Sequence, residues 1–313
     1  MRGPLDVSLP GVAPPGGAVS GGGARAGLPP TRWHGHEFAW GAKTFVMGVV
    51  NITPDSFSGD GLASNPAEAV ARVEAVVVEG ADLVDIGAES TRPGSTAVPV
   101  EEQLRRLLPV LQAVQGRVAV PISVDTNRAA VADAALRAGA SMINDVRGLT
   151  ADPELAEVIA AHAVPVVVMH DVPPSPGDDL LVSIVRELDR RLNRAVEAGI
   201  APELLIVDPG FGFGKDWRQN LELLRRLGEL RVLERPVLVG TSRKSTIGRV
   251  LGVAEDDRVE GTAATVALAI AAGADVVRVH DVRAQARVAR MSDAVVRGAP
   301  VSSLTWAGGP SAE

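Results

Sequence analysis

Short, continuously hydrophobic runs alternate with longer stretches of helical periodicity through the middle of the chain. The runs are rich in Val and Ile, as expected of parallel strands that are covered on both faces. Eight strands are predicted, at Thr44–Ile52, Asp82–Ala88, Val118–Asp125, Met142–Val146, Pro165–His170, Leu204–Asp208, Pro236–Gly240 and Asp275–His280. Ala- and Arg-rich stretches after them predict helices at Pro66–Glu79, Val100–Gln115, Arg128–Ala138, Pro153–His162, Ser183–Ala198, Trp217–Leu227, Arg258–Ala272 and Ala284–Val296.

The regularity of this alternation indicates the fold. Gly80, Gly139, Gly199 and Gly273 stand just after predicted helices, where a left-handed residue is favoured. Eight strand–helix pairs over roughly 250 residues match the size and rhythm of a (β/α)8 barrel. A doubly wound open sheet is the alternative, but it normally has fewer strands and a Gly-rich first turn. The first turn here, Asn51–Asp55, is polar, so we predict an α/β protein with a TIM barrel.

The two ends of the chain lack this periodicity. Residues 1–30 contain eight Gly and six Pro, a composition typical of disorder. We therefore predict a disordered or poorly ordered Gly/Pro-rich N-terminal tail over 1–40, a barrel over 41–298 and a flexible C-terminal tail over 299–313. Ala24–Ala26 is weakly similar to a signal-peptide cleavage site, but Asp6 and several prolines interrupt the apolar stretch that such a peptide needs. We expect a cytoplasmic protein.

Composition narrows the possible chemistry. The 313 residues include no Cys, no Tyr and only five His. Disulfides, thiolate metal sites, a Cys nucleophile and a phenolic general acid are thereby excluded. The net charge of −7 argues against nucleic acid or an anionic membrane surface as the main partner, although a cationic pocket could still bind a small anion. No apolar run approaches the ~18 residues of a membrane span.

Polar residues gather where the active site of a TIM barrel lies, at the C-terminal ends of the strands. Any one of them could simply cap the following helix. Because polar groups follow all eight strands, however, we predict a concave polar site. The residues concerned are Asn51, Asp85, Glu89, Asp125, Asn144, Asp145, His170, Asp208, Ser242, Arg243, Lys244, Arg278 and His280.

Some of these residues suit an anion. Thr241–Ser245 follows the seventh strand and opens a helix, so backbone N–H groups and cations converge there. Arg278 and His280 alternate along the eighth strand and share one face. An anionic leaving group would suit them together with Asn51 and Arg92. With few carboxylates facing that anion, a Mg²⁺ held by phosphate oxygens, water and one protein oxygen fits the pattern.

Other residues suit a flat heterocycle. Asp125, Asn144 and Asp208 offer acceptors and an amide to the edge of such a ring. The Gly-rich run Asp208–Lys215 lacks the spacing of a phosphate loop and the hydroxyl that should follow its lysine. Its glycines instead let the loop approach a flat ligand that Phe213 covers, although packing of Phe213 in the core is the alternative.

Seven motifs, in order, resemble the dihydropteroate synthase family of the folate pathway. They are Asn51–Ser58, Glu89–Gly94, Ser123–Thr126, Ile143–Asp145, Asp208–Lys215, Ser242–Ser245 and Arg278–Asp281, and the resemblance spans roughly residues 44–297. The family joins 4-aminobenzoate to 6-hydroxymethyl-7,8-dihydropterin diphosphate, giving 7,8-dihydropteroate and diphosphate. The resemblance implies a dissociative reaction, with a pterin-stabilised carbocation captured by the arylamine, and a homodimer that forms through the last helices.

The resemblance also implies roles for individual residues. The pterin site would comprise Asp125, Asn144, Asp208 and Lys244 at the ring edge, Met169 and Gly240 lining the slot, and Arg278 stacked on the ring. The diphosphate would contact Thr91, Arg92, Arg278 and His280, and Asn51 would bind Mg²⁺. The aminobenzoate region, where sulfonamides also bind in the family, would comprise Thr91, Arg92, Pro93, Phe213, Ser242 and Lys244. Catalysis would depend on Asp125, Asp208, Lys244 and Arg92.

The chain departs from the family pattern in three loops. Gly87 is followed by Ala88 where the family usually has a second glycine, and the first loop reads Ser58–Gly61 instead of the usual Asp-Gly-Gly. Met169 and His170 lead into Asp171–Pro174, where the family commonly continues Met-Gln-Gly. Two alternatives share the pterin site: a pterin-binding methyltransferase module and a non-catalytic paralogue. The first would lack the Ser-Thr-Arg-Pro-Gly and Ser-Arg-Lys-Ser stretches that are present here.

Overall fold

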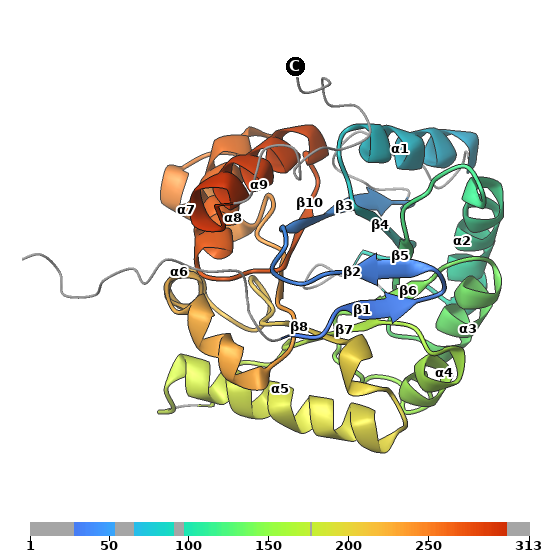
Figure 1. The fold of residues 1–313 in the computed structure, drawn as a ribbon, viewed down its shortest axis with the longest axis horizontal. Coiled ribbons are helices and arrows are strands. Elements are labelled where there is room, and N and C mark those ends of the chain that lie inside the picture. The colour runs from blue at the N-terminus through green and yellow to red at the C-terminus, as the bar shows by residue number, and fades with distance from the viewer. Residues whose placement is uncertain (1–27, 54–65, 91–96, 176, 299–313) are drawn as a thin grey trace, which may run out of the picture.

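In the computed structural model of the chain, helices surround a barrel of parallel strands (Figure 1). The structure describes residues 28–53, 66–90, 97–175 and 177–298. The barrel strands are β3 (Phe45–Asn51), β4 (Leu83–Gly87), β5 (Ile122–Asp125), β6 (Met142–Asp145), β7 (Val166–Met169), β8 (Leu205–Asp208), β9 (Leu238–Val239) and β10 (Val276–Val279). The helices are α1 (Pro66–Val78), α2 (Val100–Val114), α3 (Ala129–Arg137), α4 (Leu155–His162), α5 (Leu180–Glu197), α6 (Trp217–Arg225), α7 (Ser245–Leu251), α8 (Val259–Ala271) and α9 (Val282–Val296).

The sheet confirms the predicted (β/α)8 barrel. Its eight strands run in the order β8-β7-β6-β5-β4-β3-β10-β9, and the pairings between them are parallel. A parallel bridge between Val207 and Val237 brings β8 beside the start of β9 and closes the ring. Two predicted strands are clearly too long, because β9 spans only Leu238–Val239 of the predicted Pro236–Gly240 and β5 begins at Ile122 instead of Val118. Pro121, directly before it, has no N–H with which to extend the ladder.

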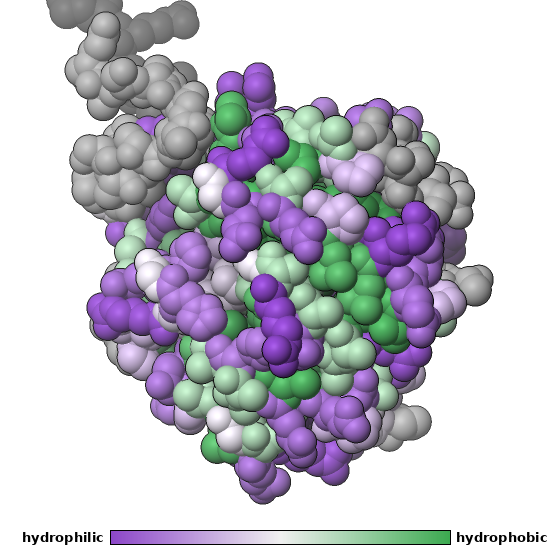
Figure 2. All heavy atoms as spheres, turned by 90° about the vertical axis from the view of Figure 1, so that its right-hand side faces the viewer, coloured by the Kyte–Doolittle hydropathy of each residue, from purple (hydrophilic) through white to green (hydrophobic). Residues whose placement is uncertain are grey.

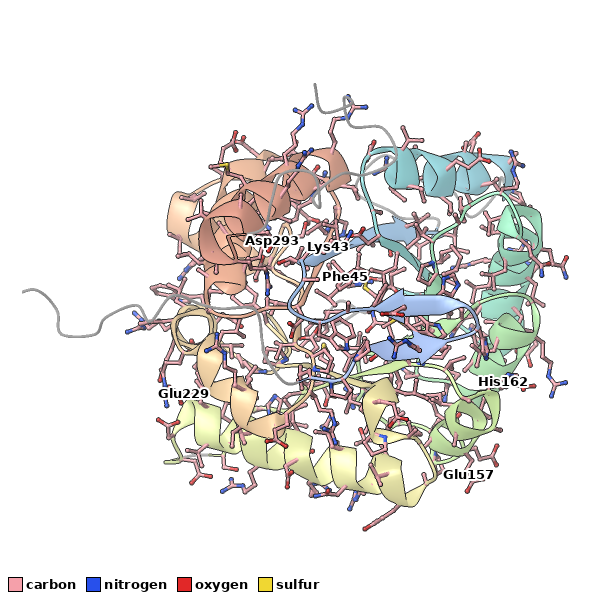
Figure 3. All side chains as sticks on the ribbon, viewed as in Figure 1. Lys43, Phe45, Glu157, His162, Glu229 and Asp293 are labelled. Atoms are coloured by element: carbon pink, nitrogen blue, oxygen red, sulfur yellow. The ribbon has the colours of Figure 1, made fainter. Side chains whose placement is uncertain are left out.

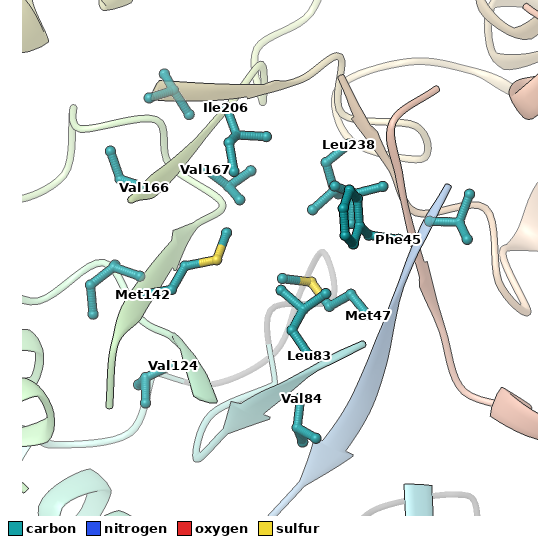
Figure 4. Close-up of a cluster of buried hydrophobic side chains, with 14 of the residues drawn as sticks. Phe45, Met47, Leu83, Val84, Val124, Met142, Val166, Val167, Ile206 and Leu238 are labelled. Atoms are coloured by element: carbon teal, nitrogen blue, oxygen red, sulfur yellow. The ribbon is translucent and has the colours of Figure 1, made fainter. Parts of the chain in front are cut away.

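Side chains alternate between the inside of the barrel and the surrounding helices. Figure 4 shows Phe45, Met47, Leu83, Met142, Val167, Ile206 and Leu238 pointing into the barrel, with Val84, Val124 and Val166 on its outer side. This period of two is that of any strand. The next inward position along several strands is polar, since Asp125 and Asn144 follow Ser123 and Met142 by two residues. The apolar filling therefore supports a polar layer at the C-terminal ends.

A short hairpin covers the opposite end of the barrel, which corrects the predicted tail boundary at residue 40. Strands β1 (Thr31–Trp33) and β2 (His36–Phe38) are antiparallel and lie across the barrel in Figure 1. Phe38 stacks on Phe45, the first residue of β3, with ring centroids 4.3 Å apart, and the Thr31 hydroxyl donates to the Glu203 carbonyl before β8 at 2.7 Å. The burial of Trp33, Phe38 and Trp40 orders this segment despite its Gly/Pro-rich neighbours. Residues 1–27 and 299–313, predicted to be tails, lie outside the described residues.

The last helix is anchored to the first barrel strand. Asp293 of α9 accepts hydrogen bonds from the backbone N–H (2.6 Å) and hydroxyl (2.8 Å) of Thr44. In Figure 3, Asp293 lies beside Lys43 and Phe45, where β3 begins. These bonds fix the start of the strand that ends at Asn51 in the predicted site.

The outer face around α2, α3 and α4 is mixed in character, with hydrophilic side chains around smaller hydrophobic areas (Figure 2). No helix among the described residues combines the length and the apolar character needed to cross a membrane.

Candidate active site

Four strands contribute one buried ion-pair network at the C-terminal end of the barrel. Arg278 of β10 donates from Nε to Asp85 Oδ2 of β4 at 2.7 Å and from Nη2 to Asp125 Oδ2 of β5 at 2.9 Å. Asn144 of β6 donates from Nδ2 to the same Asp85 oxygen at 2.9 Å. The structure thus brings together Asp125, Asn144 and Arg278, which the sequence analysis assigned to the pterin site. Asp85, to which no role was assigned, connects them.

The network leaves acceptors unused. Asp125 Oδ1 and Asp85 Oδ1 are buried and accept no hydrogen bond from the described residues. Burial raises the pKa of Asp125 to about 7, while the charge of Arg278 acts in the opposite direction. Buried acceptors without partners cost free energy, which a ligand bearing N–H groups would recover. This end of the barrel is therefore suited to a neutral or cationic ring with donors on its edge.

Asp208 ends β8, paired in register with Met169 of β7. Its Oδ1 accepts from the Gly210 N–H at 2.7 Å, and burial raises its pKa. Gly210 has a φ of +70°, and a Cβ there would meet the His170 carbonyl oxygen at 1.8 Å. Only glycine fits at this position, which explains why the Gly-rich loop follows directly after Asp208.

Lys215 fastens the same loop to the end of β7. Its Nζ lies 3.0 Å from His170 Nδ1, and it donates to the carbonyls of Gly210 at 3.1 Å and Phe213 at 2.9 Å. Burial lowers the pKa of Lys215 to about 7 and that of His170 to about 3, so the imidazole is neutral and accepts at Nδ1. His170, predicted to lie on the rim of the site, is instead fully buried beneath it.

Phe213 and Lys244 meet above this loop. The Lys244 ammonium lies 4.1 Å from the centroid of the Phe213 ring, a cation–π contact. Phe213 is only partly buried, in contrast to the fully buried Phe211, so the core-packing alternative for Phe213 is wrong. Lys244 occupies the N-cap position of α7, and its stem passes Gly212, where a Cβ would lie 3.0 Å from Cδ.

Ser242 and His280 form a second pair nearby. The His280 backbone N–H donates to Ser242 Oγ at 3.1 Å, and Oγ lies 3.0 Å from His280 Nδ1. Burial lowers the pKa of His280 to about 3, helped by the charge of Arg278, so the ring is neutral. When the Ser242 hydroxyl donates to Nδ1, the Nε2–H is left as a donor. The neighbouring Arg243 is directed to Asp281, with N–O distances of 3.0 and 2.6 Å.

The remaining predicted residues lie around these groups. Asn51 is paired in register with Gly87, where an added Cβ would lie 3.3 Å from Asn51 Oδ1. Gly240 lies beside Arg278, since a Cβ added to this glycine would lie 3.8 Å from the arginine Cβ, and Met169 is buried. Thr91, Arg92 and Pro93, predicted for the diphosphate and aminobenzoate, lie outside the described residues. Among the described residues, no group of three or more His, Asp or Glu side chains could hold a metal ion.

Two of the polar residues at the strand ends serve the scaffold. Asp145 accepts from the N–H groups of Arg147 (2.8 Å) and Leu149 (2.6 Å) and so caps the turn after β6, while burial raises its pKa to about 6. Glu89 accepts from the Val98 N–H and the Gln103 side chain, each at 3.0 Å, and holds the start of α2. These two side chains therefore stabilise loops, and neither forms the helix cap that the alternative predicted.

Arg191 of α5 is a buried residue that the sequence reasoning missed. It donates to the Met169 carbonyl at 2.5 Å, the Arg147 carbonyl at 3.0 Å and Asp171 Oδ1 at 2.8 Å. It thereby ties together the loops after β6 and β7, including the segment Asp171–Pro174 that departs from the family pattern. A signal was present, because Arg191 lies on the apolar face of α5 among Leu188, Leu192 and Ala195.

The chain is similar to known proteins in both sequence and structure. The family model described as "Pterin binding enzyme" matches residues 47–280. The chain is 46% identical over 254 residues to the dihydropteroate synthase of Bacillus subtilis, covering 81% of this chain and 89% of that protein. The structure of Yersinia pestis dihydropteroate synthase with a sulfonamide drug complex has a TM-score of 0.80 at 39% identity, covering 85% of this chain and 98% of that one. The Xanthomonas albilineans dihydropteroate synthase in complex with 7,8-dihydropteroate has a TM-score of 0.73 at 42% identity, covering 81% and 93%.

Proposed function

The chain belongs to the dihydropteroate synthase family, and from this premise we propose how its own residues bind the two substrates and support the reaction. It is a transferase that condenses 6-hydroxymethyl-7,8-dihydropterin diphosphate with 4-aminobenzoate, giving 7,8-dihydropteroate and diphosphate. The observation that carries the proposed site is the buried network of Asp85, Asp125, Asn144 and Arg278, whose unused acceptors face no protein donor among the described residues.

The pterin ring would bind between the ends of β5, β6 and β8. Asp125 and Asp208 accept from N–H groups on the ring edge, and Asn144 adds its amide. Lys244 donates to the edge from the other side, Met169 and Gly240 line the slot, and the Arg278 guanidinium stacks on the ring. The partners of Arg278 support this placement, because Asp85 and Asp125 hold the guanidinium at two points.

The reaction would proceed by departure of the diphosphate before attack of the amine. The bond between the methylene carbon and the diphosphate oxygen breaks, and the electron pair leaves with the diphosphate. The resulting cation is delocalised into the pterin, beside the buried carboxylates of Asp125 and Asp208. The amine lone pair then forms the C–N bond, and the nitrogen loses a proton. Preorganised charge of this kind stabilises the transition state without a covalent nucleophile.

The leaving group would contact Thr91, Arg92, Arg278 and His280. Because His280 is neutral, it donates a hydrogen bond to the diphosphate and adds no charge. Asn51 fits a Mg²⁺ ion, since its amide oxygen is a hard donor and the absence of a side chain at Gly87 leaves that oxygen uncrowded on one side; the other ligands would be diphosphate oxygens and water. Bound Mg²⁺ would neutralise part of the diphosphate charge.

The amine would bind where Phe213, Ser242 and Lys244 meet, together with Thr91, Arg92 and Pro93. The contact between Lys244 and Phe213 places a cation and an aromatic face at one point, suited to the carboxylate and ring of 4-aminobenzoate. The Yersinia pestis relative is known in a sulfonamide drug complex, and we extend sulfonamide binding at this region to the present chain.

A homodimer through the last helices is also part of the proposal. Large apolar side chains are exposed on α7, α8 and α9: Val250, Leu251, Leu268, Met291 and Val295. They are half of the ten large apolar side chains that are exposed among the described residues, and their place on neighbouring helices favours burial against a second copy. Sedimentation should give the mass of a dimer, and Leu268→Glu combined with Met291→Glu should give a monomer. A wild-type monomer at micromolar concentration would contradict the dimer.

The activity is tested with purified protein, Mg²⁺ and both substrates. We expect one diphosphate per 7,8-dihydropteroate formed, with turnover dependent on the amine. A secondary deuterium isotope effect at the methylene carbon tests the order of events, because departure of the leaving group first requires a normal effect. A value near unity would favour concerted displacement.

A further inference from the structure

We propose that Asp85 is a positioning residue that fixes the direction of the Asn144 amide and the plane of Arg278, so that the slot presents Asn144 Oδ1 to the ligand as an acceptor. This inference rests on the proposed function, because it assigns the donor–acceptor selectivity of the same pterin slot. Asp85 lies below the slot and has no exposed surface, so it acts only through the residues that it holds.

The geometry centres on one oxygen atom. Asp85 Oδ2 accepts from Arg278 Nε at 2.7 Å and from Asn144 Nδ2 at 2.9 Å. The three side chains come from β10, β4 and β6, and Asn144 is paired in register with Asp125 on the intervening strand β5. Asp85 thereby joins the two residues that would contact the ring edge and the ring face.

The chemistry of a carboxylate sets the direction of the amide. An ionised carboxylate only accepts hydrogen bonds, whereas an amide can present either its oxygen or its NH₂ group. Asn144 must therefore turn Nδ2 toward Asp85. Its Oδ1 accepts no hydrogen bond from the described residues, which leaves it to accept from a ligand. The alternative rotamer would place two acceptors against each other and is strongly disfavoured.

Asp85 also gives Arg278 a partner that the ligand does not compete for. Asp125 is the other carboxylate on the guanidinium, but its role in the slot is to accept from the ring. When the ring binds, Asp125 is shared between the ring and Arg278, whereas the hydrogen bond from Arg278 to Asp85 is unchanged. The guanidinium therefore keeps its plane through binding, as stacking on a flat ring requires.

The first experiment is a double-mutant cycle on pterin binding. Asp85→Leu replaces the carboxylate with an apolar group of the same branching, and calorimetry measures the Kd of 6-hydroxymethylpterin. We expect about 10- to 100-fold weaker binding, the range for losing hydrogen bonds to a charged group. When Asp85→Leu is introduced into the Asn144→Leu variant, the logarithm of the pterin Kd should increase by less than half as much as it does in the wild type. Equal losses in both backgrounds would overturn the proposal.

Two controls separate positioning from general damage to the barrel. Ser123→Ala alters the buried neighbour that is paired in register with Asp85 and has no hydrogen-bond partner among the described residues. It should change the pterin Kd by less than about threefold. Asp85→Asn keeps one oxygen acceptor and should restore most of the affinity lost in Asp85→Leu. A loss as large for Asp85→Asn as for Asp85→Leu would contradict the role assigned to that acceptor.

An exchange of the two groups gives a test that does not depend on Asp85→Leu folding. Asn144→Asp alone places two carboxylates together and should weaken pterin binding at least 10-fold. Adding Asp85→Asn removes the repulsion between the two carboxylates. It should recover only part of the loss, because the oxygen that it replaces also accepts from Arg278 Nε. No recovery at all in the double variant would overturn the proposal. If wild-type protein itself bound no 6-hydroxymethylpterin, the proposed function would fail instead.

Discussion

The titration of Asp125 offers a quantitative prediction about the pterin slot. Its carboxyl is buried between Asp85 and Arg278, and burial raises its pKa to about 7. Asp125 Oδ2 accepts from Arg278, so a proton on this carboxyl would sit on Oδ1 and turn the acceptor offered to the ring edge into a donor. Protonation below pH 7 therefore competes with pterin binding, and affinity should rise as the pH increases.

The magnitude follows from the fraction of Asp125 that is ionised in the unliganded protein. With a pKa of about 7, that fraction is roughly one tenth at pH 6 and nine tenths at pH 8. Because the apparent Kd is the intrinsic Kd divided by the competent fraction, it should fall about tenfold between these pH values. Binding should release about one proton at pH 6 and almost none at pH 8.

Calorimetry with 6-hydroxymethylpterin, in buffers of different ionisation enthalpy, measures both the Kd and the proton release. Lys215 also has a pKa near 7, lowered by burial, so its titration needs a control. Asp125→Asn removes the carboxyl and leaves Lys215 in place, and this variant should bind weakly with no pH dependence over the range. A wild-type Kd that is flat from pH 6 to 8, or that rises with pH, would refute the reasoning.

Three further predictions concern other parts of the molecule. Lys215→Met removes the donor that holds Phe213, so the KM for 4-aminobenzoate should rise about tenfold while the pterin Kd changes less than threefold; equal changes in both would contradict a role confined to the loop. His280→Gln, which keeps a neutral donor, should retain at least tenfold more kcat/KM for the pterin diphosphate than His280→Ala, and a kinetic pKa near 6.5 that is lost in both variants would refute the neutral imidazole. Trp33→Ala should lower the free energy of unfolding by about 3–5 kcal/mol in denaturant titrations and leave both KM values unchanged, whereas altered KM values would mean that the hairpin reaches the site.

The barrel could be predicted from sequence, and so could the gathering of polar residues at one end of it, because both follow from local pattern. Continuous apolar runs mark covered parallel strands, and the polar residue that ends each run lies at the same edge of the sheet. Asp125, Asn144, Asp208 and Arg278 were found in this way. The hydrogen bonds of these residues could not be predicted from the sequence, because they depend on the register between β4, β5, β6 and β10.

Other features were hidden for identifiable reasons. Strands β1 and β2 have three residues each, too few for a period to emerge, and their order comes from aromatic packing against Phe45. Asp145 and Glu89 have the same residue types as the carboxylates of the candidate pterin site, and only the three-dimensional structure shows that they hold the turn after β6 and the start of α2. Asp85 could be recognised from the sequence as a polar strand residue. Its hydrogen bonds to Asn144 and Arg278 could not be predicted, because they depend on how the strands are arranged in space.

We propose that the buried acceptors at the end of this barrel bind a pterin diphosphate for condensation with an arylamine. Mass spectrometry can follow this reaction for the wild-type chain and for Asp208→Asn, with Mg²⁺ and both substrates. We predict 7,8-dihydropteroate and diphosphate in equal amounts from the wild type, and at least 100-fold slower formation by a folded Asp208→Asn variant. Absence of 7,8-dihydropteroate with folded wild-type protein, or an unchanged rate for Asp208→Asn, would contradict the account.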